Sequence, residues 1–114
     1  MSKNVTQIYL DGLTEEEVLI TNNSSISGYT FNPTLFRNLG VQNYLEHSKK
    51  LTKIVNNKPI SLEVTGDDES TIINQSITLS KISKNVYVKI PITFTSGEYT
   101  TEVLKELVKE GVNL

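Results

Sequence analysis

The stretch PISLEVTGDDE, residues 59–69, holds a strand and the start of a helix in direct succession. Pro59–Val64 is a short run of β-prone residues, and Thr65-Gly66 ends it with turn chemistry. A helix cap and an acidic first turn follow at Asp67–Glu69. The segment therefore predicts a β-strand followed at once by an α-helix, which we expect to continue to about Ile82.

The same order recurs toward the C-terminus. Val86–Ile92 is β-prone and predicts a strand, and apolar residues at helical spacing predict a helix over Tyr99–Glu110. Gly111 is suited to the end of that helix. Val112–Leu114 then has the character of the opening of a fifth strand, so the sequence reads as the front half of something larger.

Two further units precede residue 59. Gln7–Asp11 predicts a strand, and the Thr-x-x-Glu spacing of a capping box opens a helix over Thr14–Thr21. Ile26–Thr30 predicts a weak strand, followed by one helical turn over Thr34–Asn38 and a longer helix over Val41–Val55. Strands thus alternate with helices four times, which predicts one α/β domain, residues 1–114, with parallel strands and right-handed crossovers.

Composition narrows the classes of function. The 114 residues suit one domain, and 11 basic against 13 acidic residues give no charge argument for nucleic acid or an anionic membrane as partner. The absence of cysteine excludes disulfides and thiolate metal sites, and a single histidine, His47, argues against a catalytic triad or a multi-histidine metal site. Neither a signal peptide nor an apolar run of ~20 residues is present, so a cytoplasmic location is expected.

Polar residues stand at the expected carboxyl ends of all the strands. In parallel α/β folds the functional groups gather at that edge of the sheet, so we expect these side chains to converge on one opening. They are Asp11, Thr30, Asn32, Glu63 and Lys89.

Lys89 is the best candidate for a reactive group. It lies between Val88 and Ile90, and a lysine inside a buried strand is costly unless it is paired or neutral. Desolvation favours the neutral amine, which can attack a carbonyl carbon. The alternative is that Lys89 lies on an edge strand and extends to solvent.

The other candidates each have two interpretations. Asp11 and Glu63 can form an acid/base pair, or each can be a capping or salt-bridging acid. Asn32 can bind a substrate hydroxyl or shape the turn before Pro33, and Thr30 can be a simple strand residue. The acidic runs at 15–17 and 67–69 are better explained as helix starts than as cation sites, and His47 as an ordinary helix residue.

These residues, in this order, resemble the transaldolase family. The resemblance runs from about residue 7 to residue 114, and the ordered Thr-x-Asn-Pro and Val-Lys-Ile-Pro motifs are its most specific parts. The matching segments are Ile8–Asp11, Gly28–Leu35, Ile60–Val64, Asn85–Pro91 and Lys109–Val112.

The resemblance implies a (β/α)8 barrel, of which this chain holds the first four units, and transfer of a dihydroxyacetone unit between sugar phosphates without metal or organic cofactor. It implies that Lys89 is the Schiff-base nucleophile, that Asp11 is the acid/base for the C4 hydroxyl, and that Glu63 positions the catalytic water. Asn32 and Thr30 would bind substrate hydroxyls. Related fructose-6-phosphate aldolases typically have glutamine where Glu63 stands, so the chain is more similar to a transaldolase.

The chain also departs from the family pattern. Gly12 and Phe31 each replace a threonine, and the threonine-rich segment Pro91–Ser96 has no evident role. The family's phosphate-binding arginine and serine, and the threonine of its fifth strand, belong to the absent half. Two alternatives to the transferase therefore stay open: a structural module in which two half barrels pair as a homo-oligomer, and an aldolase that cleaves fructose 6-phosphate.

Overall fold

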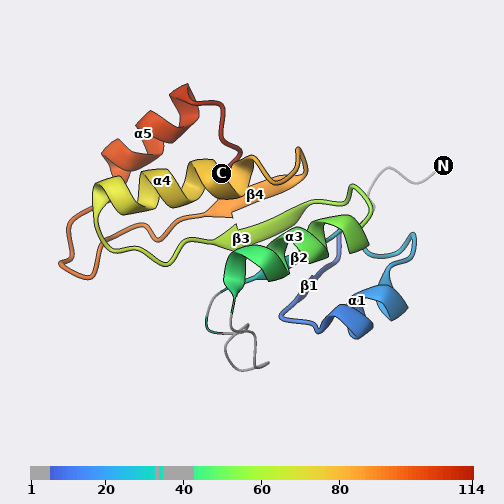
Figure 1. Ribbon diagram of the computed structural model, residues 1–114. Coiled ribbons are helices and arrows are strands. Elements are labelled where there is room, and N and C mark those ends of the chain that lie inside the picture. Colours follow the sequence, from blue (N-terminus) through green and yellow to red (C-terminus); the bar gives the residue numbers. More distant parts are fainter. Residues whose placement is uncertain (1–5, 33, 35–42) are drawn as a thin grey trace.

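The described strands form one parallel sheet in the order in which they occur along the chain (Figure 1). The computed structural model describes residues 6–32, 34 and 43–114. Each strand pairs in parallel with its neighbour in sequence, so the order is β1-β2-β3-β4. The strands are β1 (Tyr9–Asp11), β2 (Gly28–Phe31), β3 (Ile60–Glu63) and β4 (Val86–Lys89).

Helices follow the strands, as the alternating pattern predicts. The described helices are α1 (Glu15–Thr21), α3 (Tyr44–Ile54), α4 (Glu69–Ser80) and α5 (Thr101–Lys109). The capping box of α1 is confirmed, because Thr14 Oγ1 accepts from the Glu17 amide at 3.1 Å and Glu17 Oε1 accepts from the Thr14 amide at 2.9 Å. Asp68 caps α4 by accepting from the amide of Thr71 at 3.0 Å. Local chemistry therefore sets where these two helices begin.

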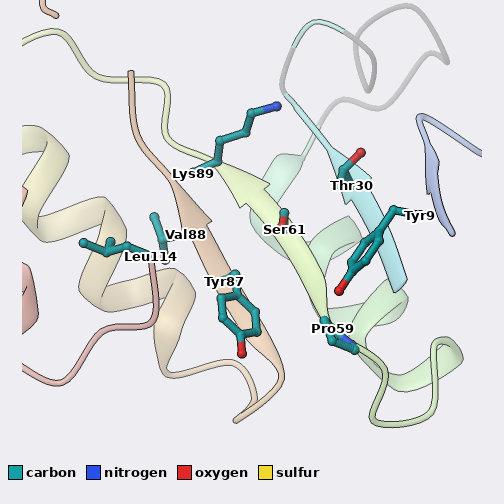
Figure 2. Close-up of a pocket in the computed structure, with 8 residues that line it drawn as sticks. All are labelled: Tyr9, Thr30, Pro59, Ser61, Tyr87, Val88, Lys89 and Leu114. Carbon is teal, nitrogen blue, oxygen red and sulfur yellow. The ribbon is translucent and has the colours of Figure 1, made fainter. Parts of the chain in front are cut away.

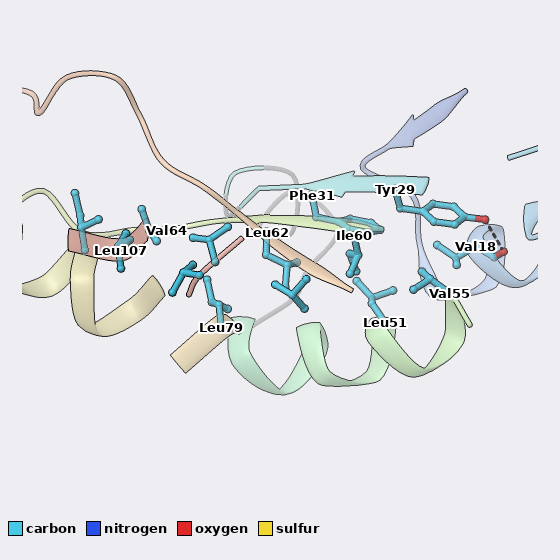
Figure 3. Packing of buried hydrophobic residues seen from close by; sticks show 14 of the residues in the cluster. Val18, Tyr29, Phe31, Leu51, Val55, Ile60, Leu62, Val64, Leu79 and Leu107 are labelled. Atoms are coloured by element: carbon cyan, nitrogen blue, oxygen red, sulfur yellow. Dashed lines mark hydrogen bonds between the residues drawn. The ribbon is translucent and has the colours of Figure 1, made fainter. Parts of the chain in front are cut away.

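One face of the sheet carries the core. Along β3 and β4 buried and more exposed residues alternate, with Ile60, Leu62, Val86 and Val88 on the buried side. Figure 3 shows Phe31, Ile60 and Leu62 among the buried side chains between the sheet and the helices, together with Leu51 and Leu79. Strand periodicity then places the intervening side chains on the opposite face.

Several boundaries differ from those expected. The fourth strand ends at Lys89 rather than Ile92, because Pro91 has no amide hydrogen and the chain turns away there. Helix α4 ends at Ser80, so Ile82 lies beyond it. The helical turn predicted over 34–38 falls outside the described residues except at 34, as does the predicted start of α3 at Val41.

The segment after α5 returns to the edge of β4. The Val88 amide donates to the carbonyl of Asn113 at 2.8 Å, and Val112 is buried. No strand is assigned to Val112–Leu114, but its contact is with the strand beside which a fifth strand was expected. No helix in the described part of the chain has the length and apolar character needed to cross a bilayer.

Candidate active site

The candidate residues lie on the sheet face opposite the helices. Figure 2 shows Thr30, Ser61 and Lys89 on this side, with Tyr9 and Tyr87 toward the amino ends of the strands. The face forms a shallow hollow of about 490 Å³ that these side chains line. Within the described residues no helix covers it, and we call it the open face.

Sheet register sorts the open face into layers. Asp11, Thr30, Ser61 and Tyr87 are successive partners across the strands and form one layer. Glu63 and Lys89 are partners one layer nearer the carboxyl ends. Asn32 follows β2 directly and, two residues after Thr30, comes at the level of Glu63. All five predicted residues are thus on or next to the same face and edge.

Asp11 and Thr30 form a direct contact. The Thr30 hydroxyl donates to Asp11 Oδ1 at 2.6 Å, across the β1–β2 pair. Asp11 is exposed and Thr30 is half-buried. The hydrogen bond holds the Asp11 carboxylate in one orientation on the open face and leaves its other oxygen available to a ligand.

Glu63 and Lys89 end adjacent strands. The Val64 amide donates to the carbonyl of Lys89 at 3.2 Å and forms the last rung between β3 and β4. On the helix side, the Tyr44 hydroxyl donates to the carbonyl of Glu63 at 2.6 Å. Burial raises the pKa of Tyr44 well above its ordinary value, so this hydroxyl keeps its proton and remains a donor.

The two pairs are separated along the sheet. Asp11 on β1 and Lys89 on β4 are three strand spacings apart, which is about 14 Å at ~4.8 Å per spacing on a flat sheet. The expectation that all the strand-end groups converge on one opening is therefore met only pairwise. Convergence across the full set needs the sheet to curve further, as it does when strands close into a barrel.

Lys89 itself is exposed, which corrects the expectation of burial. Lys89 alternates outward from Val86 and Val88, and β4 lies at one end of the strand order. The alternative of an edge-strand lysine extending to solvent describes its environment here.

Ser61 is a site residue that sequence reasoning missed. It lies on the open face between Thr30 and Tyr87, in the layer of Asp11. The alternation of side chains along β3 could have predicted this position. Because Ile60 and Leu62 point toward the core, Ser61 must share the opposite face with Glu63. Tyr9 also belongs here, and its ring lies so close to Gly28 that a Cβ there would be 2.5 Å from Tyr9 Cε2.

The remaining acidic runs and His47 lie away from this face. His47 Nδ1 is 3.6 Å from Glu15 Oε2, which joins α3 to α1 on the helix side. Burial lowers the pKa of His47, and the Glu15 carboxylate opposes that shift. Residues 15–17 and 68–69 begin helices, as expected. Among the described residues, no group of three or more His, Asp or Glu side chains is arranged to hold a metal ion.

The sequence can now be compared with known proteins. A family model described as Transaldolase/Fructose-6-phosphate aldolase matches residues 8–114, which include all the described strands. The chain belongs to this family. The match begins one residue before β1, so the transaldolase pattern and the sheet start together.

Curated members of the transaldolase family are similar over much of the chain. A "Probable transaldolase" of Thermoanaerobacter sp. (strain X514) is 36% identical over 109 residues, which cover 95% of this chain and 50% of the relative. One of Methanococcus maripaludis (strain C6) is 35% identical, covering 78% of this chain and 40% of the relative. One of Parvibaculum lavamentivorans is 39% identical, covering 69% and 35%. The chain spans half or less of the length of these curated relatives.

Proposed function

We propose that residues 1–114 form the first half of a transaldolase-type (β/α)8 barrel and that Lys89 is its Schiff-base nucleophile. The observation that carries this proposal is the position of Lys89 at the carboxyl end of β4, beside Glu63 at the end of β3. Active-site groups of β/α barrels stand at that end of the strands. Asp11 and Thr30 occupy the same face, three strands and two strands away from Lys89 respectively.

The proposed reaction starts with attack of the Lys89 amine on the carbonyl carbon of a ketose phosphate. Loss of water gives an iminium ion, which accepts the electron pair of the C3–C4 bond when the C4 hydroxyl loses its proton. In the closed barrel, where the curvature of the sheet brings Asp11 toward Lys89, Asp11 takes that proton, and an aldose phosphate leaves as the aldehyde. The enamine that remains attacks an acceptor aldehyde, the proton returns, and hydrolysis of the new imine releases the amine.

The other residues support these steps. Thr30 orients the Asp11 carboxylate through its 2.6 Å hydrogen bond and, with Asn32, lies where substrate hydroxyls would bind. Glu63 stands beside the nucleophile and would position the water that is lost and regained. We place this activity in the cytoplasm, in the pentose phosphate pathway, with sugar phosphates as substrates. Glu63, rather than glutamine, favours transfer over release of free dihydroxyacetone.

Trapping with borohydride tests the nucleophile. The chain is incubated with fructose 6-phosphate and borohydride, and the adduct is mapped by peptide mass. We expect a reduced adduct on Lys89 that disappears in Lys89→Met and persists in Lys84→Met, a matched loss of an exposed lysine before β4. An adduct distributed equally over both lysines, or none in a sample shown to be folded, contradicts the assignment for this chain.

Comparison of two assays separates transfer from cleavage. Release of aldose phosphate is measured with and without an acceptor aldose phosphate. A transferase needs the acceptor for repeated turnover, because the enamine is otherwise held on Lys89. Equal turnover without acceptor, together with free dihydroxyacetone, would assign the chain to the aldolase alternative.

A non-enzymatic alternative has its own supporting observation. The open face exposes Tyr9 (44%), Tyr87 (41%) and Leu114 (43%), and β1 lies at an end of the strand order. Two copies that pair through these surfaces would form a homo-oligomeric structural module. Sedimentation at several concentrations tests this candidate, since a species that stays monomeric excludes it.

A further inference from the structure

The threonine-rich segment after Lys89 forms a small hairpin. Thr93 and Tyr99 form an antiparallel bridge, and the Phe94 amide donates to the carbonyl of Glu98 at 2.8 Å. The Gly97 amide closes the turn onto the Phe94 carbonyl at 2.9 Å, with Gly97 at a φ of 91°. We call residues 93–99 the threonine hairpin. It connects β4 to α5.

Asp67 connects this hairpin to the preceding strand–helix loop. The Thr95 amide donates to Asp67 Oδ1 at 2.8 Å, and the Thr95 hydroxyl donates to Asp67 Oδ2. These two hydrogen bonds hold the pKa of Asp67 below its ordinary value, because they stabilise the carboxylate. The loop of Asp67 follows Glu63, and the hairpin of Thr95 follows Lys89.

Each of the joined segments is held in place near its own strand. Gln75 of α4 accepts from the amides of Thr65 at 3.0 Å and Gly66 at 2.8 Å, which fixes the loop after β3. At the base of the hairpin, buried Thr100 donates through its hydroxyl to the carbonyl of Pro91 at 2.6 Å. A link between two fixed segments transmits its constraint to the strand ends from which they start.

The backbone pairing of the two strands ends at this level. The last rung, from the Val64 amide to the Lys89 carbonyl, is 3.2 Å long, at the upper limit of ordinary hydrogen bonds. Both strands end here, so no further rung supports it. Lateral separation of the ends of β3 and β4 would move Lys89 away from Glu63.

We propose that Asp67 is a positioning residue, which acts through Thr95 to hold the end of β4, with Lys89, against the end of β3, with Glu63. The contact is a clamp between the two loops that follow the reactive strand ends. Its value for catalysis rests on the function proposed above, whereas its effect on the sheet does not.

Amide hydrogen exchange measured by NMR tests the clamp without any substrate. In Asp67→Ala, we expect the Thr95 amide to lose its protection and the Val64 amide to exchange roughly two- to tenfold faster, the range that corresponds to about one ordinary hydrogen bond. The Ile60 amide, which donates to Asn85 at 3.0 Å at the other end of the same strand pair, should be unchanged relative to the wild type.

Asp68→Ala is the matched control. Asp68 accepts from the Thr71 amide and from the hydroxyls of Thr71 and Ser70, so all these bonds stay within the first turn of α4. Loss of the Asp68 side chain lowers the stability of the protein but removes neither hydrogen bond of the clamp. Any change in the exchange rate of the Val64 amide should therefore be matched by the Ile60 amide. Thr95→Ser should keep wild-type exchange, because serine retains both donors, and Thr95→Val should lie between the wild type and Asp67→Ala.

A second measurement reads the catalytic consequence. The rate of borohydride trapping on Lys89 should fall in Asp67→Ala and Thr95→Val by more than in Asp68→Ala. Unchanged exchange at Val64 in Asp67→Ala overturns the clamp, and faster exchange at Val64 with unchanged trapping overturns its positioning role. If the wild type forms no adduct, the proposed function fails for this chain, and hydrogen exchange alone still decides whether the clamp holds the strands.

Discussion

At the end of β3, one hydroxyl group binds the backbone of Glu63, the residue beside Lys89. The Tyr44 hydroxyl donates to the Glu63 carbonyl at 2.6 Å, and the side chain comes from the first residue of α3. A buried carbonyl that loses its donor carries a desolvation cost. This contact therefore links the packing of α3 to the position of Glu63.

Tyr44→Phe should lower the free energy of unfolding by about 1 kcal/mol, because one half-buried hydrogen bond is lost without a change in volume. Urea denaturation measures the loss. Tyr29→Phe is the matched control, since the Tyr29 hydroxyl lies 3.2 Å from Thr21 Oγ1, on the helix side and away from Glu63. Similar losses of stability, with slower trapping on Lys89 only in Tyr44→Phe, would support a role for this contact in the site. Equal trapping in both variants would limit the contact to stability.

The same hydroxyl predicts a dependence of stability on alkaline pH. Burial raises the pKa of Tyr44 above its ordinary value of 10.0, so the folded state holds this proton more tightly than the unfolded state. The resulting stabilisation is complete below pH 10 and is lost progressively as the pH rises above that value. Above a pH of about 10, the free energy of unfolding of Tyr44→Phe should therefore decrease less steeply with pH than that of the wild type. The melting temperature of each protein is measured as a function of pH. Identical slopes for Tyr44→Phe and the wild type would contradict this prediction.

Among the elements, helix α1 is short and relies on the hydrogen bonds of its first turn. It has seven residues, and only Val18 among them is buried. A helix of this length is marginal without tertiary packing and caps. The reciprocal hydrogen bonds between Thr14 and Glu17 satisfy two amides that would otherwise have no helical partner.

Thr14→Ala should destabilise the protein by about 1 kcal/mol, the usual cost of losing an N-cap side chain. Thr14→Ser should retain most of the wild-type stability, since serine keeps the acceptor oxygen. Thermal unfolding followed by circular dichroism measures both variants. A serine variant as unstable as the alanine variant would show that the methyl group, and not the cap, carries the effect.

The elements that sequence predicted well are those set by local chemistry. The starts of α1 and α4 follow from Thr14 and Asp68, whose partners are three residues away. Strand–helix alternation follows from the period of the apolar residues, so the parallel sheet was also predictable. The end of β4 at Lys89 does not follow from β-propensity, because Ile90 and Ile92 are β-prone, whereas Pro91 between them lacks the amide hydrogen of a strand residue.

The parts of the site that were not predictable depend on distant residues. The bond between Asp67 and Thr95 joins residues 28 apart, and neither residue type by itself indicates a partner. The exposure of Lys89 depends on which segments cover the open face. The sequence of β4 alone does not predict those segments. The residues themselves were found by position, because a strand end is a local feature, and their chemical roles stay predictions.

For the molecule as a whole, the open face sets the expectation for self-association. Tyr87 lies on that face and is 41% exposed, whereas Val108 is 65% exposed on α5. Burying an aromatic side chain between two copies is favourable, and placing a charge there is costly. If copies pair through the open face, Tyr87→Glu should shift the dimer toward monomer and Val108→Glu should not. Analytical ultracentrifugation of both variants gives the answer, and a shift caused only by Val108→Glu would place the contact on the helix side.

The strand order β1-β2-β3-β4 also has a consequence for how the protein is made. Each strand pairs with the strand that precedes it in the sequence. Its partner has therefore already been synthesised when the new strand leaves the ribosome. Chains grow at about 5–20 residues per second, which is slow compared with the docking of a short strand and helix. The nascent chain can therefore add one unit at a time to an existing edge, and within the described residues the segment after α5 reaches the edge of β4 through the hydrogen bond from the Val88 amide to the Asn113 carbonyl.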